Sequence, residues 1–297
     1  MNRAPVAGEP GWPQASSVVV GVIGDPVRHS LSPALHNAAF TAMALDWVSV
    51  AFPVPPGALD AALDGVRALG VRGLSVTMPF KEAVAAKVDR SSATAARLGA
   101  VNCVLVEPDG LVGDNTDGEG FLAALARGAQ FDPSGRRCLV AGAGGAARAV
   151  VLALAQAGAA EVVVVGRTPA RAAEAARLAG DAGRTGTPAD AARCDLVVNA
   201  TPLGMAGTSD PHALAPVDPA LLGPAQLVVD LVYVPRPTRW LALAQSRGAT
   251  TLDGLGMLVH QAARQVELWA GRPAPLEAMW RAATGEDRHR RVTALEG

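Results

Sequence analysis

The sequence has no excess of charge of either sign and no long apolar segment. Its 26 lysines and arginines nearly balance 27 aspartates and glutamates. The formal net charge of −1 gives no electrostatic reason to expect binding to nucleic acid or to an anionic membrane. No apolar run approaches the roughly 20 residues of a transmembrane helix, because Arg148, Gln156 and Glu161 interrupt the longest candidate. Residues 1–16 lack the apolar core of a signal peptide. We therefore expect a cytoplasmic protein with no nucleic-acid or membrane partner.

Cysteine is also scarce. Cys103, Cys138 and Cys194 are odd in number, widely spaced and set in apolar surroundings. This pattern argues against a disulfide framework and contains no metal-ligand spacing. We expect three buried free thiols in a reducing compartment and no bound metal.

Apolar, strand-like runs alternate with helical segments along the 297 residues. This length favours two domains, and the rhythm predicts an α/β fold with parallel sheets covered on both faces. A plausible hairpin turn lies at 107–110. Pro33, after Ser32, and Pro79 are predicted at first helical positions, the second helix spanning 79–88. The predicted strands span 18–23, 47–52, 71–76, 101–106, 111–112, 137–141, 161–165, 195–199, 226–231 and 249–252.

Two short segments place reactive side chains after strand-like runs. SVTMPFK, at 75–81, ends in Lys81, and GDNTDG, at 113–118, contains Asp117. A lysine and a carboxylate are the usual members of a proton-transfer pair. The alternative is a solvated lysine at a helix start.

A glycine-rich segment follows the predicted strand 137–141. GAGGAAR, at 142–148, has Gly142, Gly144 and a small third residue, Ala147, at the spacing of the dinucleotide-binding fingerprint. Gly142 permits a tight turn, Gly144 permits close approach of a pyrophosphate, and the helix N-terminus offers free N–H groups to the anion. The alternative is a glycine turn that binds no ligand.

The next strand, 161–165, ends in GRTPAR at 166–171, without the acidic residue that holds the ribose of NAD. Arg167 and Arg171 lie four residues apart around a helix start at Thr168, so both guanidinium groups can converge on one phosphate. The sequence therefore predicts a 2′-phosphate site and NADP (NADPH) as cofactor. The alternative is a pair of solvated arginines.

Ser30 and Ser32 follow the first predicted strand and flank one leucine. In an extended loop both hydroxyls point the same way and could hold a hydroxyl- or carboxylate-bearing ligand. Ordinary helix capping by Ser32 is an equally good interpretation. His29 and His36 have no further ligands at metal-binding spacing.

From Val20 to about Ala283 the chain resembles the shikimate dehydrogenase family. The motifs that carry the resemblance, in family order, are GDPVRHSLSPALHN, GLSVTMPFK, GAVNCV, GDNTDG, GAGGAAR, GRTPAR, NATPLGM and DGLGMLVHQ. The resemblance implies NADP-linked interconversion of shikimate and 3-dehydroshikimate. It implies that Lys81 and Asp117 are the catalytic pair. Further implied substrate residues are Ser30, Ser32, Thr77, Asn102, Tyr233 and Gln261, and implied cofactor residues are Gly142, Ala143, Gly144, Gly145, Ala146, Arg167, Thr168, Arg171, Thr201, Leu231 and Gly254.

The resemblance also implies the domain organisation. A substrate domain is expected at 17–117 with 255–285, and a Rossmann NADP-binding domain at 118–254, with flexible termini at 1–16 and 286–297. The sequence departs from many family members at Ser75 and Gly166, where asparagine is common. A quinate/shikimate or aminoshikimate-type dehydrogenase, a non-catalytic NADP sensor and a folate-type dehydrogenase are the alternatives. A monomer or a homodimer is expected.

Overall fold

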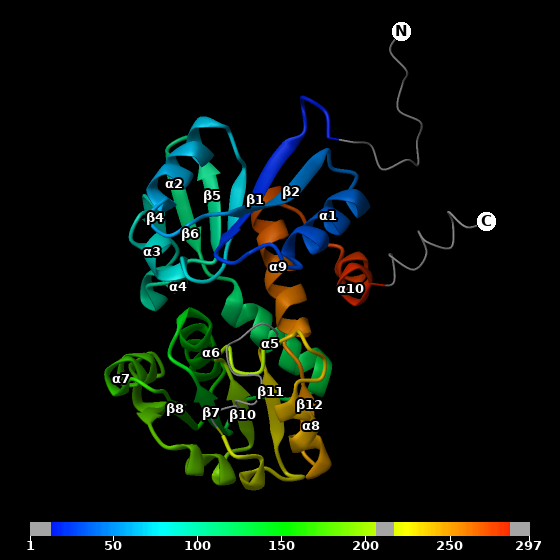
Figure 1. The fold of residues 1–297 in the computed structure, drawn as a ribbon. Coiled ribbons are helices and arrows are strands. Elements are labelled where there is room, and N and C mark those ends of the chain that lie inside the picture. Colours follow the sequence, from blue (N-terminus) through cyan, green and yellow to red (C-terminus); the bar gives the residue numbers. More distant parts are fainter. Residues whose placement is uncertain (1–12, 206–216, 286–297) are drawn as a thin grey trace, which may run out of the picture. The chain divides into compact units, whose positions relative to one another are not determined.

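The computed structural model of this chain describes residues 13–205 and 217–285 (Figure 1). The chain divides into two compact units. Unit 1 comprises Met1–Ala95, Gly99–Asp114 and Ala262–Gly297, and unit 2 comprises Ala96–Leu98 and Asn115–Gln261. Most of the termini predicted to be flexible, 1–12 and 286–297, lies outside the described residues. No helix in the described ranges is both long enough and apolar enough to span a membrane.

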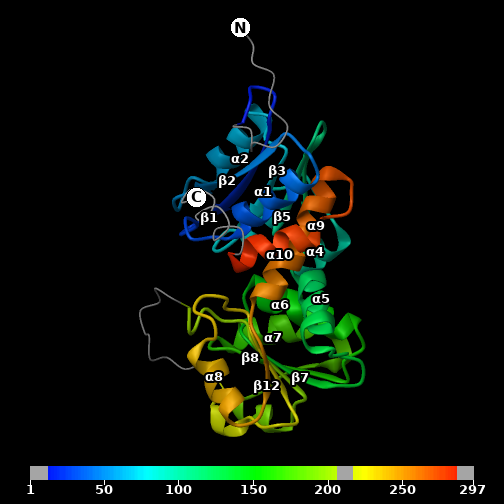
Figure 2. The same ribbon diagram turned by 90° about the vertical axis from the view of Figure 1, so that its right-hand side faces the viewer.

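Unit 1 is built on a six-stranded sheet flanked by helices. The strands are β1 (Val18–Gly24), β2 (Trp47–Pro53), β3 (Gly73–Val76), β4 (Arg90–Ser91), β5 (Cys103–Glu107) and β6 (Gly110–Asp114), and their order in the sheet is β2-β1-β3-β5-β6-β4. The helices are α1 (Ser32–Ala42), α2 (Leu59–Ala68), α3 (Lys81–Ala85), α4 (Ala93–Leu98), α9 (Leu255–Ala270) and α10 (Leu276–Thr284). Helix α10 packs against α1 (Figure 2). Helices α4 and α9 each contain a division between the units.

The sheet of unit 1 is mixed. Strands β1, β2 and β3 run parallel, whereas β5 runs antiparallel to both β3 and β6. The predicted hairpin between β5 and β6 is confirmed, and Gly110 at φ +136° supplies the left-handed backbone of its turn. A short turn of this kind can join only antiparallel strands.

Trp269 of α9 fixes the C-terminal part of that helix on the sheet of unit 1. The indole is 2% exposed, and its Nε1 donates to the carbonyl oxygen of Val104 at 3.0 Å. It lies directly over Gly73 of β3, where a Cβ atom would collide with the ring. A glycine in the central strand therefore makes room for the largest fully buried side chain among the described residues.

Unit 2 has a six-stranded, fully parallel sheet (Figure 1). The strands are β7 (Arg137–Ala141), β8 (Glu161–Val165), β9 (Gly183–Thr185), β10 (Leu196–Asn199), β11 (Leu227–Asp230) and β12 (Thr250–Leu252), in the order β12-β11-β10-β7-β8-β9. With β7 as its first strand, this is the 3-2-1-4-5-6 order of a Rossmann domain read from the other side. The longer helices are α5 (Asp117–Ala129), α6 (Gly145–Gln156), α7 (Pro169–Arg177) and α8 (Arg239–Ser246).

The predicted helix start at Pro79 is wrong. Helix α3 begins at Lys81 and is only five residues long. The N–H of Phe80 donates to the carbonyl of Thr77 at 3.0 Å, so residues 77–80 form a turn that precedes the helix. The preference of proline for the first helical position predicts a helix from Pro79. The hydrogen-bonded turn over 77–80 takes up this residue, so the helix begins two residues later. The predicted start near Pro33 is confirmed, since α1 begins at Ser32.

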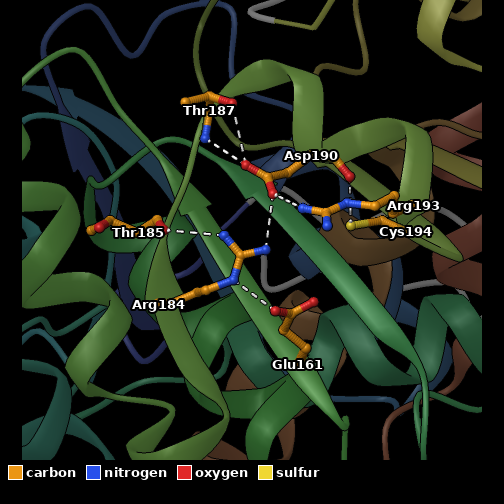
Figure 3. Close-up of polar contacts among 7 residues, drawn as sticks. All are labelled: Glu161, Arg184, Thr185, Thr187, Asp190, Arg193 and Cys194. Carbon is orange, nitrogen blue, oxygen red and sulfur yellow. Dashed lines mark hydrogen bonds and ion pairs between the residues drawn. The ribbon is translucent and has the colours of Figure 1, made fainter.

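An ion-pair network ties the β9 edge of unit 2 to the turn that follows it (Figure 3). Arg184 donates to Glu161 at 2.6 Å and to Asp190 at 2.9 Å, and Arg193 donates to Asp190 at 2.6 Å. Asp190 also accepts from the N–H of Thr187 at 2.8 Å, closing a capping box. These donors, with the Thr187 N–H as the largest cause, hold the pKa of Asp190 well below its usual range. The edge strand is thereby covered by charged side chains, which opposes pairing with another chain.

Candidate active site

The loop after β7 has the geometry of a dinucleotide-binding turn. Gly142 sits at φ +129°, and its N–H donates to the carbonyl of Val165 at 2.8 Å. A Cβ atom at this position would lie 2.8 Å from the carbonyl oxygen of Ala200. Both the backbone conformation and the neighbouring strand therefore require glycine. The Cβ of Ala147, a fully buried residue, would lie 3.3 Å from a Cβ on Gly142, so a small third residue is also needed.

Gly144 is a glycine for a different reason. Its backbone is extended, with φ −83° and ψ −177°, and it is the N-cap of α6. A Cβ atom built on it would meet no protein atom within 4 Å. No side chain caps α6, so the first N–H groups of the helix, from Gly145 onward, face the space beside Gly144. An open approach to a helix N-terminus fits the pyrophosphate of a dinucleotide.

The arginine-containing loop after β8 lies beside the glycine loop. Strands β7 and β8 pair with Ala141 opposite Val165, and a Cβ atom on Gly166 would lie 3.7 Å from that of Ala143. Arg167, Thr168 and Arg171 are all exposed. Thr168 is the extended N-cap residue of α7, and Pro169 occupies the first turn of that helix. Both arginines are thus carried on short segments next to the loop that would hold the pyrophosphate, which fits a 2′-phosphate.

The strand ends of β10 and β11 carry a buried polar network that sequence reasoning missed. Asn199 Oδ1 accepts from the N–H and the hydroxyl of Thr201 at 3.0 and 2.6 Å. Its Nδ2 donates to Asp230 Oδ1 at 2.9 Å. Both Asn199 and Asp230 are fully buried, and burial raises the pKa of Asp230 to about 6. The available signal was a polar residue that ends each of two apolar strands, LVVN and LVVD.

Two further predicted cofactor residues, Leu231 and Gly254, lie next to this network and contact each other. The N–H of Leu231 donates to the carbonyl of Asn199 at 2.9 Å. Gly254 packs so closely on Leu231 that a Cβ atom would overlap its carbonyl oxygen. Tyr233, two residues later, is half-buried, and this burial raises the pKa of its phenol. The phenol is therefore a neutral hydrogen-bond donor near pH 7.

In unit 1, the loop that carries Ser30 and Ser32 begins beside Thr77, at the carboxyl ends of β1 and β3. The N–H of Thr77 donates to Ile23 at 2.9 Å, and a Cβ atom on Gly24 would collide with the Thr77 side chain. Ser32 is the first residue of α1 and makes no capping bond, so the capping interpretation is wrong. Instead, the Ser30 hydroxyl accepts from the N–H of Ser32 at 3.2 Å.

Backbone hydrogen bonds connect Lys81 to the predicted substrate residue Asn102. The N–H of Val101 donates to the carbonyl of Lys81 at 2.9 Å, and the N–H of Asn102 donates to Asp114 at 3.0 Å. Gln265 of α9 donates its amide to the carbonyl of Asn102 at 2.9 Å. Asn102 is 1% exposed and Lys81 is half-buried. Thr77, Lys81 and Asn102 therefore lie on segments of unit 1 that backbone hydrogen bonds join.

Asp117 and Gln261 belong to unit 2. Asp117 is the first residue of α5, is 3% exposed and donates its N–H to Asn115 Oδ1 at 3.1 Å. The adjacent Thr116 hydroxyl donates to the carbonyl of Gln261 at 3.1 Å. A Cβ atom on Gly120 would lie 2.7 Å from the Gln261 nitrogen, so α5 and α9 are in close contact here. Each member of the predicted dyad is thus held by a different unit, with Asp117 three residues after the division at Asp114.

Three family models match parts of this chain. Residues 22–104 match the model of the shikimate dehydrogenase substrate-binding domain. Residues 124–203 match the shikimate/quinate 5-dehydrogenase model, and 254–284 match the shikimate 5′-dehydrogenase C-terminal domain.

The chain is also similar to full-length relatives. It is 46% identical to the NADP(+) shikimate dehydrogenase of Moorella thermoacetica, over 90% of this chain and 92% of the relative. The shikimate 5-dehydrogenase of Thermus thermophilus, solved with NADP(H) and shikimate, superposes with a TM-score of 0.83 and 41% identity, over 90% of this chain and 98% of that one. The quinate dehydrogenase of Corynebacterium glutamicum, solved with NAD, has a TM-score of 0.81 and 31% identity, over 90% and 98%.

Substitution of the two glycines is expected to separate folding from cofactor binding. Gly144→Ala meets no protein atom, so its unfolding temperature should stay within about 2 °C of wild type, while the NADP+ dissociation constant rises roughly tenfold or more. Gly142→Ala should instead unfold earlier, because a left-handed alanine costs about 1–3 kcal/mol and contacts Ala200. Thermal melts and calorimetric titration with NADP+ make the comparison. The control is Gly65→Ala in α2, where there is also open space. Wild-type affinity in Gly144→Ala would contradict the assignment.

Proposed function

The chain belongs to the shikimate dehydrogenase family, and we propose that Lys81 and Asp117 move the proton in the reaction that it catalyses. It is an NADP-dependent oxidoreductase acting on a CH–OH group, and it interconverts 3-dehydroshikimate and shikimate. This reaction belongs to the biosynthesis of aromatic compounds. The observation that carries the proposal is the hydrogen-bonded connection from Lys81 through Val101 and Asn102 to Asp114, three residues before Asp117.

The reaction requires a hydride and a proton to be separated. In the oxidation direction, the C–H bond of the secondary alcohol breaks and its two electrons leave as hydride, while the O–H proton leaves for a base. NADP+ supplies the hydride acceptor, so the chain's own task is to orient the alcohol and to handle the proton. In the reduction direction, the Lys81 ammonium stabilises the developing alkoxide and gives it the proton. Asp117 orients the ammonium and accepts from the neighbouring substrate hydroxyl.

The remaining candidates are proposed to divide between the two ligands. The hydroxyls of Ser30 and Ser32 suit the carboxylate of the substrate, and Thr77, Asn102 and Gln261 suit its ring hydroxyls. Tyr233, as a neutral donor, is placed with this set. The glycine loop, Gly142 to Ala146, would hold the pyrophosphate, with Arg167, Thr168 and Arg171 at the 2′-phosphate. Thr201, Leu231 and Gly254 would border the nicotinamide.

The finer organisation is also a proposal. We assign substrate binding to 17–117 with 255–285 and cofactor binding to 118–254. A cytoplasmic location is supported by three buried free cysteines, Cys103, Cys138 and Cys194. That the protein is a monomer or a homodimer and binds no nucleic acid stays a prediction. The effect of Ser75 on substrate preference also stays a prediction; this residue is 5% exposed in β3.

Shikimate is expected to be the preferred substrate. Reduction of NADP+ followed at 340 nm with shikimate and with quinate in parallel should give a higher kcat/KM for shikimate by at least tenfold. The physical reason is that quinate carries an extra ring hydroxyl, which a pocket fitted to shikimate must leave unpaired or clash with. A higher kcat/KM for quinate, or a preference for NAD+, would overturn the substrate assignment. No turnover with either alcohol would favour a non-catalytic NADP sensor.

Lys81→Ala is expected to lower kcat by roughly 10²–10⁴-fold with little change in the KM for shikimate, because the lost group acts on the proton in the transition state. Steady-state kinetics in both directions provide the measurement. Lys87→Ala is the matched control, since Lys87 pairs with Asp60 in the same unit. Normal kcat with a large rise in KM would show that Lys81 only binds substrate.

Arg167→Ala is expected to weaken the binding of NADP+ far more than the binding of NAD+. A charge-assisted hydrogen bond contributes about 1.5–3 kcal/mol, so the NADP+ dissociation constant should rise roughly 10- to 100-fold while that of NAD+ hardly changes. Arg177→Ala, at the exposed C-terminal end of α7, the helix that follows Arg167, serves as control. Equal weakening of both nucleotides would remove Arg167 from the 2′-phosphate site.

A further inference from the structure

The carboxylate of Asp230, at the end of β11, is fully buried and accepts hydrogen bonds from three groups. Its Oδ1 accepts from Asn199 Nδ2 at 2.9 Å and from the N–H of Val232 at 3.0 Å. Its Oδ2 accepts from the hydroxyl of Thr238 at 2.7 Å. That hydroxyl also accepts from the N–H of Leu241 at 3.3 Å, so its hydrogen is directed to Asp230. Every one of these contacts of the carboxylate is therefore with a donor.

These contacts join two loop segments at the carboxyl edge of the unit 2 sheet: residues 200–203, which follow β10, and residues 231–238, which follow β11. Asn199, held by Asp230, in turn orients Thr201 and donates to the carbonyl of Leu203 at 3.2 Å. On the other side, Val232 and Thr238 bracket the segment that carries Tyr233. These two loop segments thus share one anchor.

The charge on this anchor has no cationic partner among the residues that the structure describes, since no ion pair involves Asp230. The negative charge of Asp253, after β12, raises the pKa of Asp230. Asp253 is itself paired with Arg236 at 2.6 Å. From β10 the facing group is the uncharged Asn199. From α8 it is the uncharged Thr238, followed by the exposed Arg239. Tyr233 is neutral near pH 7. Burial is the largest cause of the raised pKa of Asp230, about 6, and the three donors oppose it.

We propose that Asp230 is a positioning residue whose ionised carboxylate holds both loops in the arrangement that binds the nicotinamide half of NADP, and whose protonation releases them. A protonated carboxyl must donate its hydrogen, but each of the three neighbouring groups already donates a hydrogen to it. Either the Thr238 hydroxyl or one of the two N–H groups then loses its acceptor inside the protein, which is costly. Cofactor affinity is accordingly present above about pH 6 and is lost as the pH falls through this range. The inference rests on the proposed function for the identity of the ligand.

The test compares the pH dependence of NADP+ binding in wild type and Asp230→Asn, by calorimetric titration between pH 5 and 8. The 2′-phosphate of NADP+ titrates in the same range, so the difference between the two proteins is the readout. Asp230→Asn has the same shape but no titratable charge. At pH 8 the variant should bind NADP+ roughly tenfold more weakly than wild type. The plots of dissociation constant against pH for the two proteins should converge near pH 5. Asp218→Asn, an exposed N-cap carboxylate of unit 2, is the matched control.

A second pair of variants keeps the proposal testable if Asp230→Asn does not fold. Thr238→Val removes the donor to Asp230 Oδ2 and should weaken NADP+ binding at pH 8. The midpoint of its pH profile should lie at a higher pH than that of wild type, because the lost hydrogen bond lowers the pKa of Asp230. Thr238→Ser should restore both. Wild-type affinity and an unchanged pH profile in the Asp230 or Thr238 variants would overturn the proposal. Wild-type turnover of shikimate at pH 8 is measured first, so failure of the proposed function is recognised separately.

Discussion

Parallel pairing of β8, β7, β10 and β11 is the constraint on which the structure of unit 2 depends. The register sets Val165, Ala141, Asn199 and Asp230 level with one another, so each strand ends at the same edge of the sheet. Loops that lie far apart in the chain must then meet there. The glycine turn lies against the carbonyl of Ala200, and Gly166 of the arginine loop lies beside Ala143 of the glycine loop. None of these loops could be placed independently of the strands.

In unit 1 a mixed sheet brings together loops that lie far apart in the chain. The parallel pair β1 and β3 brings the start of the loop after β1, at Gly24, to Thr77, and the antiparallel β5 brings Asn102 back alongside β3. The N–H of Val76 and the amide of Gln265 both donate to the carbonyl of Asn102, at 2.8 and 2.9 Å. The backbone of Asn102, a predicted substrate residue, is therefore held by hydrogen bonds from within the unit.

The sequence predicts the parts of this protein whose signals are local. The Gly142–Gly144 turn, the 107–110 hairpin and the strand 137–141 follow from residue type and spacing, and the structure confirms these elements. The start of α3 was missed because a turn over 77–80 overrides the helix preference of Pro79. Asn199 and Asp230 were missed because their partnership spans 31 residues and depends on strand register, which no local pattern contains.

The cost of a buried carboxylate at Asp230 argues that it serves the loops and not the sheet. Strands β10 and β11 are already paired through their main chains, and an apolar side chain in this position would pack without a charge to desolvate. Such a residue would, however, leave one N–H of Asn199 Nδ2, the Val232 N–H and the Thr238 hydroxyl without their present acceptor, at about 1–3 kcal/mol for each. The donors are therefore part of the same design as the carboxylate. They are useful only if the backbone beyond each strand must be held in one conformation, and the residues so held are those that border the proposed nicotinamide position.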